Sequence, residues 1–154
     1  MQQIRNIATL AGFLSLVAVT AATGIVFEPG SWYAGLSKPP WTPPNWLFGP
    51  VWTALYIGIG VAGWQVWRRT RSWAAAPMLA WAAQLGFNAL WSWLFFGLHW
   101  TGLAFVDLLA MLGSIVVFIA KAYPISRSAA LLFVPYALWV AYAGSLNLAI
   151  WLLN

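Results

Sequence analysis

Cysteine is absent and charge is scarce in this chain, and both absences limit what it can do. The 154 residues include no Cys, two acidic residues and seven Lys or Arg. Without Cys, disulfides and thiolate metal ligands are excluded. The sequence also has no metal-ligand spacing motif, no Gly-rich phosphate loop and no Ser/His/Asp or Cys/His set, which argues against hydrolytic or ATP-driven chemistry.

Long apolar runs lie between the sparse charges. They cover about residues 6–27, 46–67, 73–98, 100–122 and 128–153, and each is near or above the roughly 20 residues that span a bilayer core. The connections are too short for a soluble domain, and the first run leads into more membrane-type sequence, unlike a signal peptide. The sequence therefore predicts an all-α integral membrane protein in which residues 1–154 form a single bundle of five transmembrane helices.

The basic residues predict how this bundle is oriented. In a five-helix topology, all of them except Lys38 fall on the side of the amino terminus: Arg5, Arg68, Arg69, Arg71, Lys121 and Arg127. Because cytoplasmic loops carry the excess of Lys and Arg, we expect the amino terminus to lie in the cytoplasm. The same asymmetry accounts for the pI of about 10.1, and no nucleic-acid partner is expected.

Tryptophan is the residue in excess. The chain has 13 Trp residues, whereas a membrane bundle needs Trp chiefly at its two water interfaces. Trp52, Trp91 and Trp139 lie more than one turn inside predicted spans. Either core packing or the wall of a binding cavity must explain these three residues.

The connection between the first two runs, residues 28–46 (loop 1), has the most unusual composition. It contains four prolines within six residues, at positions 39, 40, 43 and 44. Proline at this density favours stiff, extended polyproline geometry. Two interpretations stay open: a Pro/Trp-rich lid over a cavity, or a rigid connector whose Trp32, Trp41 and Trp46 lie at headgroup level.

Three of the predicted helices present aromatic and polar stripes at 3.6 residues per turn. The stripes include Trp52, Tyr56, Gln84, Asn88, Trp91, Tyr136, Trp139, Ala143, Leu146 and the neighbouring Asn147. Together they predict an aromatic-walled cavity. The alternative is that the amides only join helices through hydrogen bonds and the rings only pack.

Two further polar residues need an explanation of their own. Asp107 is the only acidic residue within an apolar run, where an uncompensated carboxylate costs on the order of 2.5–3.5 kcal/mol. It is expected either to act in the site or to anchor its helix through donors such as a Trp indole or the Asn88 amide. His99 lies at a helix boundary and is expected to be exposed, with axial ligation of a metalloporphyrin as the alternative.

Small residues spaced four apart offer surfaces on which two copies can approach closely as a homodimer. One such ridge comprises Ala82 and Gly86. The other comprises Ala54, Gly58 and Ala62. The sequence does not choose between them, and it gives no role to Trp93.

Motifs spread over the chain resemble one known family. In sequence order they are Trp32-Tyr33, Lys38-Pro39, Trp41-Thr42-Pro43-Pro44, Trp52, Leu55-Tyr56, Asn88, Trp91, Phe95-Phe96-Gly97, Asp107, Pro135-Tyr136, Trp139 and Leu146-Asn147. Their order and spacing resemble the TspO/MBR family, which comprises bacterial tryptophan-rich sensory proteins and the mitochondrial translocator protein, also called the peripheral benzodiazepine receptor. The resemblance implies a five-helix bundle, commonly a homodimer, whose cavity opens toward loop 1 and binds porphyrins, related tetrapyrroles and hydrophobic drug-like ligands.

The resemblance also implies roles for individual residues. Trp52 and Trp139 correspond to cavity tryptophans linked to light-dependent porphyrin breakdown, so they are the candidate catalytic residues. With the stripes above, the expected ligand contacts are Ala22, Trp41, Gly49, Trp52, Tyr56, Asn88, Trp91, Asp107, Trp139, Ala143 and Leu146. The Leu-Tyr-Arg type of cholesterol signature found in mammalian members is missing after Leu146, so cholesterol transport is not expected.

Three functions stay open at this point. The first is a membrane receptor or sensor that regulates tetrapyrrole metabolism; it requires no cofactor and takes protoporphyrin IX or haem as its ligand. The second is light-dependent porphyrin degradation assisted by the cavity Trp residues, and the third is transport of porphyrin or another small hydrophobic ligand. In each case Lys38 or the loop 1 backbone is expected to hold the porphyrin propionates.

Overall fold

The computed structural model describes residues 1–154, except for the side chain of Gln2. The fold is helical, and no strand occurs among the described residues. The elements in chain order are α1 (Gln2–Val26), α2 (Gly30–Gly35), α3 (Asn45–Thr70), α4 (Ala76–Ser92), the π-helical turn η1 (Trp93–Gly97), α5 (Thr101–Ala122) and α6 (Arg127–Leu153). The prediction of an all-α protein is confirmed.

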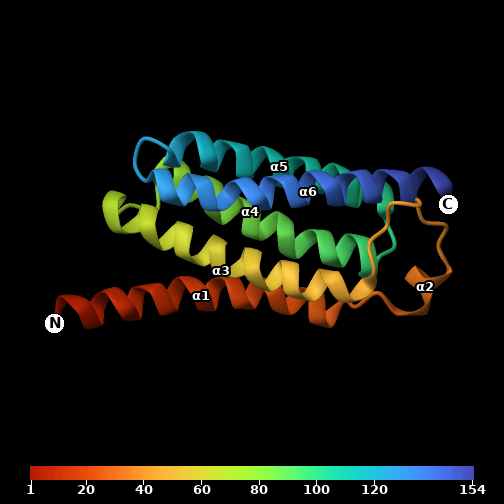
Figure 1. The fold of residues 1–154 in the computed structure, drawn as a ribbon, viewed down its shortest axis with the longest axis horizontal. Coiled ribbons are helices and arrows are strands. Elements are labelled where there is room, and N and C mark those ends of the chain that lie inside the picture. The colour runs from red at the N-terminus through yellow and green to blue at the C-terminus, as the bar shows by residue number, and fades with distance from the viewer.

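The long helices lie side by side as a bundle (Figure 1). α5 packs against both α4 and α6, α1 packs against α3 and α4, and α3 also contacts α6. The amino terminus lies at one end of the bundle, whereas α2, loop 1 and the carboxyl terminus lie at the other end (Figure 1). The Pro-rich segment is therefore close to the end of α6, although more than 100 residues separate Ser37 from its partner Asn154.

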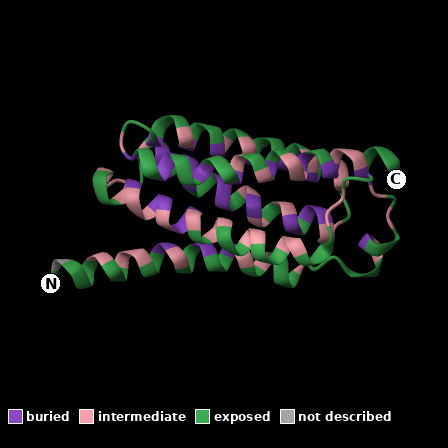
Figure 2. Ribbon diagram, viewed as in Figure 1, coloured by how far each residue is buried: buried purple, intermediate pink, exposed green. Residues whose placement is uncertain are grey.

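Four helices among the described residues, α1, α3, α5 and α6, are long and apolar enough to cross a membrane, with mean hydropathy between 1.4 and 2.5. The expected span over residues 73–98 is divided between α4, which has 17 residues, and η1, which has five. The predicted bundle of five transmembrane helices is therefore not confirmed. The chain is nevertheless a multi-pass helical membrane protein. Large apolar side chains such as Val19, Leu138 and Leu152 are exposed, and exposed positions recur along each of the long helices (Figure 2).

The core holds the helices together through rings that pack against small residues. Between α5 and α6, the rings of Phe118 and Phe133 stack with their centroids 3.9 Å apart. Between α3 and α4, the indole of Trp81 donates a hydrogen bond of 2.9 Å to the carbonyl of Ile59. Gly63 makes this contact possible, because a Cβ at that position would collide with the Trp81 ring. Small residues at close helix crossings are typical of membrane bundles.

Loop 1 is only partly extended. Its first part forms the short helix α2, and the segment from Leu36 to Pro44 contains no further helix. The side chain of Asn154 ties this segment to the end of α6, because it accepts a bond of 3.0 Å from the Ser37 N–H and donates one of 3.1 Å to the Ser37 carbonyl. A second tie is the hydroxyl of Tyr142, which donates a bond of 2.7 Å to the carbonyl of Trp41. Loop 1 is thus fixed across the end of the bundle.

Candidate functional site

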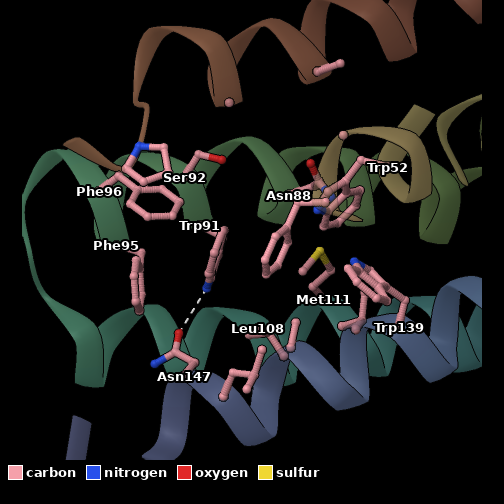
Figure 3. Close-up of a pocket in the computed structure, with 18 of the residues that line it drawn as sticks. Trp52, Asn88, Trp91, Ser92, Phe95, Phe96, Leu108, Met111, Trp139 and Asn147 are labelled. Atoms are coloured by element: carbon pink, nitrogen blue, oxygen red, sulfur yellow. Dashed lines mark hydrogen bonds between the residues drawn. The ribbon is translucent and has the colours of Figure 1, made fainter. Parts of the chain in front are cut away.

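A cavity of about 480 Å³ lies between the long helices at the loop 1 end of the bundle. Residues from α1, α3, α4, η1, α5 and α6 contribute to its wall. The aromatic members are Tyr33, Phe48, Trp52, Tyr56, Trp91, Phe95, Phe96 and Trp139. Figure 3 shows Trp52, Trp91 and Trp139 on different sides of this space. The cavity is therefore surrounded by rings rather than bordered by one aromatic face.

The rings of the wall are ordered by contacts with one another. Trp52 stacks on Tyr56, with centroids 5.2 Å apart and planes 28° apart, and meets Tyr136 edge-on at 6.2 Å. On another side, Trp91 and Phe95 stack with centroids 5.1 Å apart and planes 21° apart. Such pairs present both flat faces and ring edges. A flat π-system in the cavity could stack on them, gaining about 0.5–1.5 kcal/mol per aromatic pair beyond the burial of its surface.

A hydrogen-bonded polar network lies against the inner end of the cavity. The Tyr56 hydroxyl donates to Oδ1 of Asn88 at 2.9 Å, and Nδ2 of Asn88 donates to the hydroxyl of Tyr136 at 3.2 Å. The Tyr136 hydroxyl in turn donates to Oε1 of Gln84 at 2.9 Å. This network joins α3, α4 and α6. The interpretation that the amides join helices thus describes Gln84 and Asn88, although Asn88 also lines the cavity.

Two tryptophans of the wall differ in the use of their indole N–H groups. The indole of Trp91 donates a bond of 3.0 Å to Oδ1 of Asn147, drawn as a dashed line in Figure 3. Asn147 is itself held by a bond of 2.7 Å from its Nδ2 to the carbonyl of Thr101. The indole nitrogen of Trp139 is buried and has no partner among the described residues. Because an unsatisfied buried donor costs about 1–3 kcal/mol, Trp139 is the wall residue best suited to meet an acceptor on a ligand.

Loop 1 covers one end of the cavity, where Pro29 and Tyr33 belong to the lining. Next to this end, the rings of Trp32 and His99 stack with centroids 3.9 Å apart and planes 13° apart. His99 is exposed, as predicted, and has a positive φ of 59°. It does not line the cavity. Among the described residues, no group of three His, Asp or Glu side chains could hold a metal ion.

Lys38 was expected to be available for anionic groups of a ligand, but loop 1 itself engages it. Its ammonium donates to the carbonyls of Ala34 at 3.3 Å and Leu36 at 3.1 Å. The same nitrogen lies 4.7 Å from the centre of the Tyr33 ring. Burial raises the pKa of the Tyr33 hydroxyl, so the ring beneath the ammonium stays a neutral phenol. Lys38 therefore stabilises the turn that follows α2.

Most of the predicted ligand contacts lie on the cavity wall. These residues are Gly49, Trp52, Tyr56, Asn88, Trp91, Trp139, Ala143 and Leu146. Ala22, Trp41 and Asp107 lie outside it. On α1 the wall residues are Ala21, Gly24 and Ile25 rather than Ala22, because adjacent helical residues point about 100° apart. Trp41 is 52% exposed, and its contact with α6 is made by its backbone carbonyl. Ligand contact by any of these residues stays a prediction.

Asp107 is buried in α5 without a partner. It is 6% exposed, and neither of its carboxyl oxygens has a hydrogen-bond partner among the described residues. None of the expected donors bonds to it, and one of them, the Asn88 amide, donates to the hydroxyl of Tyr136 instead. Because Asp107 is also absent from the cavity lining, neither its expected ligand contact nor its expected anchoring bond is supported by its position.

Several wall residues were not predicted from the sequence. Phe48 lies one turn before Trp52 and packs edge-on against Trp139, with centroids 5.8 Å apart, so its helical spacing was an available signal. Phe96 joins Phe95 on the wall through η1, and π-helical turns tend to occur at functional sites. Other members, from α1 and α5, carry no aromatic or polar signal: Ala21, Gly24, Ile25, Leu108 and Met111.

The chain is similar to known proteins over nearly its whole length. The sequence model of the TspO/MBR family matches residues 8–152. The tryptophan-rich protein TspO of Archaeoglobus fulgidus is 40% identical over 152 residues, which cover 97% of this chain and 99% of that protein. Protein CrtK of Rhodobacter capsulatus is 37% identical over 139 residues, covering 89% of this chain and 87% of CrtK. The translocator protein of Homo sapiens is 39% identical over 123 residues, covering 78% of this chain and 73% of that protein.

Proposed function

Because the chain belongs to the TspO/MBR family of membrane proteins, as its sequence predicted, we propose that its cavity binds porphyrins and related tetrapyrroles. The protein would then be a membrane receptor or sensor that regulates tetrapyrrole metabolism. A relative from Cereibacter sphaeroides is named a tryptophan-rich sensory protein and is 34% identical over 142 residues, which cover 92% of this chain and 89% of that protein.

The observation that carries the proposal is the cavity of about 480 Å³ surrounded by aromatic rings. Its volume lies within the range of about 300–1,000 Å³ that is usual for small-molecule sites. A tetrapyrrole is a large flat π-system, which matches the stacked pairs Trp52 with Tyr56 and Trp91 with Phe95. The unpartnered indole of Trp139 adds one hydrogen-bond donor. Protoporphyrin IX and haem both fit this chemistry, as do hydrophobic drug-like molecules, and binding requires no cofactor.

The anionic edge of the porphyrin is proposed to lie toward loop 1. Lys38 is the only Lys or Arg in that loop, and its bonds to the carbonyls of Ala34 and Leu36 keep its charge near the end of the cavity. Propionates there remain close to the membrane surface, where their charge is solvated. The ring system then occupies the apolar interior.

A titration of protoporphyrin IX in the dark tests this proposal. The Soret absorbance is followed as purified protein is added, with Trp52→Ala compared with Trp93→Ala. Trp52 lines the cavity, whereas Trp93 is 44% exposed and does not line it. Loss of the Trp52 ring is expected to weaken binding about tenfold through lost stacking and burial, with little change for Trp93→Ala. Equal affinities for both variants would contradict the proposal.

Light-dependent porphyrin degradation is the second candidate, and the surroundings of Trp52 favour it. Its ring stacks on Tyr56, whose hydroxyl is hydrogen-bonded to Asn88. Indole and phenol rings in contact are both oxidisable, so this pair could react with a photo-excited ligand. Illumination of the bound complex would reveal the activity as loss of porphyrin absorbance. Under this candidate, Trp52→Phe and Trp139→Phe stop the loss while the porphyrin stays bound.

We also propose a membrane topology. α4 and η1 run without a break from Ala76 to Gly97, which at about 1.5 Å per residue suffices for a fifth crossing of a core about 30 Å thick. The amino terminus would then lie on the cytoplasmic side of a bacterial membrane, with loop 1 on the other side. Since the chain has no Cys, Ser37→Cys and Ser72→Cys can be labelled separately in intact cells. Labelling of Ser72→Cys alone from outside would contradict this orientation.

A homodimer is proposed through α4. Ala82 and Gly86 are exposed, and a Cβ on Gly86 would meet nothing within 4 Å. The alternative ridge is less suitable, because Ala62 is fully buried inside the bundle and Gly58 faces Leu132 of α6. Small exposed residues let two helices approach closely within a bilayer.

A further inference from the structure

One side chain, Leu108 of α5, belongs both to the cavity and to a separate groove on the outside of the bundle. The groove has a volume of about 240 Å³ and lies between α5 and α6. Its lining is apolar or small: Phe105, Leu108, Leu109, Leu112, Ala141, Gly144, Ser145 and Leu148. Leu109, Ala141 and Ser145 are exposed, so the groove opens toward the surrounding lipid. Leu108 is 1% exposed and separates the two spaces.

The residue opposite Leu108 is Gly144, which has no side chain to close the space between the cavity and the groove. Gly144 of α6 lines the groove, and a Cβ built on it would lie 3.1 Å from Cδ2 of Leu108. Its neighbour Ala143, which carries only a methyl group, lines the cavity. Figure 3 shows Leu108 on the side of the cavity formed by α5 and α6. Leu108 thus lines both spaces and packs closely against the backbone of α6 at Gly144, so its isobutyl group lies between the cavity and the groove.

The hydrogen bonds that join α5 to α6 lie on either side of this point. Toward loop 1, Asn147 donates to the carbonyl of Thr101 at 2.7 Å. Deeper in the bundle, the hydroxyl of Tyr136 lies 3.4 Å from the sulfur of Met111. Between these two positions, no hydrogen bond joins α5 to α6 among the described residues. Rotation of Leu108 would thus break no polar interaction, and leucine rotamers are separated only by ordinary torsional barriers.

We propose that Leu108 is the gate of a lateral passage through which hydrophobic ligands move between the bilayer and the cavity, between α5 and α6. This inference rests on the proposed binding function, and it names the route by which the same ligands reach their site. An apolar edge of the ligand first binds in the groove. The Leu108 side chain then rotates to another rotamer and lets the ligand enter the cavity. A porphyrin ring system partitions into the membrane because transfer of its apolar surface from water into the bilayer is favourable.

The end of the cavity beneath loop 1 is the competing route, and it is held more firmly. Asn154 bonds both backbone groups of Ser37, and Tyr142 bonds the carbonyl of Trp41. Passage there requires these polar contacts to break. Passage at Leu108 displaces apolar side chains and breaks no hydrogen bond between α5 and α6 among the described residues, in a region where the outer surface is lipid.

Binding kinetics in bilayer nanodiscs test the passage, with protoporphyrin IX already dissolved in the phosphatidylcholine. Ser145→Phe fills the groove from a position that does not itself line the cavity. It is expected to slow association and dissociation together by about tenfold, leaving the equilibrium Kd unchanged. The matched control is Leu138→Phe, since Leu138 is 68% exposed on the same helix and lines neither space. Equal rates for Ser145→Phe and the control would overturn the passage.

A second variant pair keeps the test decisive if Ser145→Phe does not fold. Leu108→Ala removes the gate, whereas Leu146→Ala shortens a leucine that lines only the cavity. The passage predicts faster association and dissociation for Leu108→Ala than for Leu146→Ala, because both enlarge the cavity but only one opens it. Identical rates in the two variants would contradict the gate. If the unsubstituted protein shows no saturable binding at all, the proposed function fails, and the passage for this ligand fails with it.

Discussion

The hydroxyl of Tyr56 on α3 donates a hydrogen bond of 2.9 Å to Oδ1 of Asn88 on α4. The Nδ2 group of Asn88 donates a second hydrogen bond to the hydroxyl of Tyr136 on α6. One amide therefore joins three helices directly beside the cavity. In a bilayer no water competes for these groups at this depth. Tyr56 and Asn88 therefore both line the cavity and help to hold three of its helices in register.

Asn88→Ala should lower the stability of the bundle. It removes one acceptor and one donor and leaves the hydroxyls of Tyr56 and Tyr136 without their shared partner. The expected loss is about 1–3 kcal/mol in the free energy of unfolding, measured by denaturation in detergent micelles. Ser92→Ala is the control, because Ser92 lines the cavity one turn along α4 but takes no part in this network. A loss of the same size in Ser92→Ala would contradict the role given to the network.

Trp139→Phe should weaken porphyrin binding without lowering the thermal midpoint. The substitution keeps an aromatic ring and removes an indole N–H that has no partner among the described residues. Loss of one ligand hydrogen bond of about 0.5–1.5 kcal/mol corresponds to an increase in Kd of about threefold to tenfold.

Trp91→Phe provides the contrast, since the Trp91 indole already donates to Asn147. That variant should lower the unfolding midpoint more than Trp139→Phe does. Differential scanning fluorimetry and the porphyrin titration, applied to both variants, separate the two effects. The reverse pattern, in which Trp139→Phe is the less stable protein, would show that its N–H is used within the fold.

Gly63→Ala should destabilise the contact between α3 and α4. A Cβ there would collide with the Trp81 indole, which is held in place by its bond to the carbonyl of Ile59. Overpacking of this kind costs about 1–3 kcal/mol. Gly58→Ala, on the same helix, has its nearest obstacle 3.9 Å away and should be neutral or stabilising by up to about 1 kcal/mol. Both values come from unfolding in the same detergent, and equal losses would refute the packing argument.

Asn154→Ala should loosen loop 1. The Ser37 N–H donates to Oδ1 of Asn154 at 3.0 Å, so its hydrogen exchange is expected to accelerate when that acceptor is removed. Leu153→Ala, whose side chain is 54% exposed, serves as the neighbouring control. Exchange mass spectrometry of a peptide that begins several residues before Ser37, such as one covering residues 31–44, reads out the effect. Unchanged exchange in Asn154→Ala would mean that loop 1 is held by other contacts.

Gly86→Leu should disrupt the proposed homodimer. The exposed surface of Ala82 and Gly86 loses its close approach when a large side chain is added. Multi-angle light scattering of the detergent-solubilised protein measures the mass of the assembly. The control is Leu138→Ala, because Leu138 is 68% exposed on α6, away from the surface formed by Ala82 and Gly86. A dimer that persists in Gly86→Leu would exclude this interface.

Sequence periodicity predicted the residues of the cavity wall better than it predicted where the helices begin and end. Trp52, Trp91 and Trp139 were predicted correctly as cavity-wall residues because each belongs to a stripe with helical spacing. Such spacing can be recognised even when the predicted ends of a helix are wrong by a few residues. The family resemblance was predicted correctly for the same reason, since its motifs depend on residue order and spacing.

The remaining differences come from contacts between segments that are distant in the sequence. One expected span changes from the α-helix α4 to the π-helical turn η1 between Ser92 and Trp93. The local sequence does not reveal this change, because bulky apolar residues continue through η1. Asp107 was expected to find donors, but the Asn88 amide is committed to Tyr56 and Tyr136 on other helices. No pattern within one helix reveals how neighbouring helices use a shared polar group.

The central claim is that the cavity binds porphyrin, and the most direct test is to fill the cavity with a larger side chain. The affinity for protoporphyrin IX is then measured in the dark by quenching of Trp fluorescence. Ala143→Phe adds a ring to the cavity wall, whereas Ala141→Phe adds the same ring two residues away, outside the cavity lining. If the cavity is the site, Ala143→Phe raises Kd by more than about tenfold while Ala141→Phe retains the affinity of the unsubstituted protein. Saturable quenching of equal affinity in all three proteins would contradict the claim and would locate the porphyrin elsewhere.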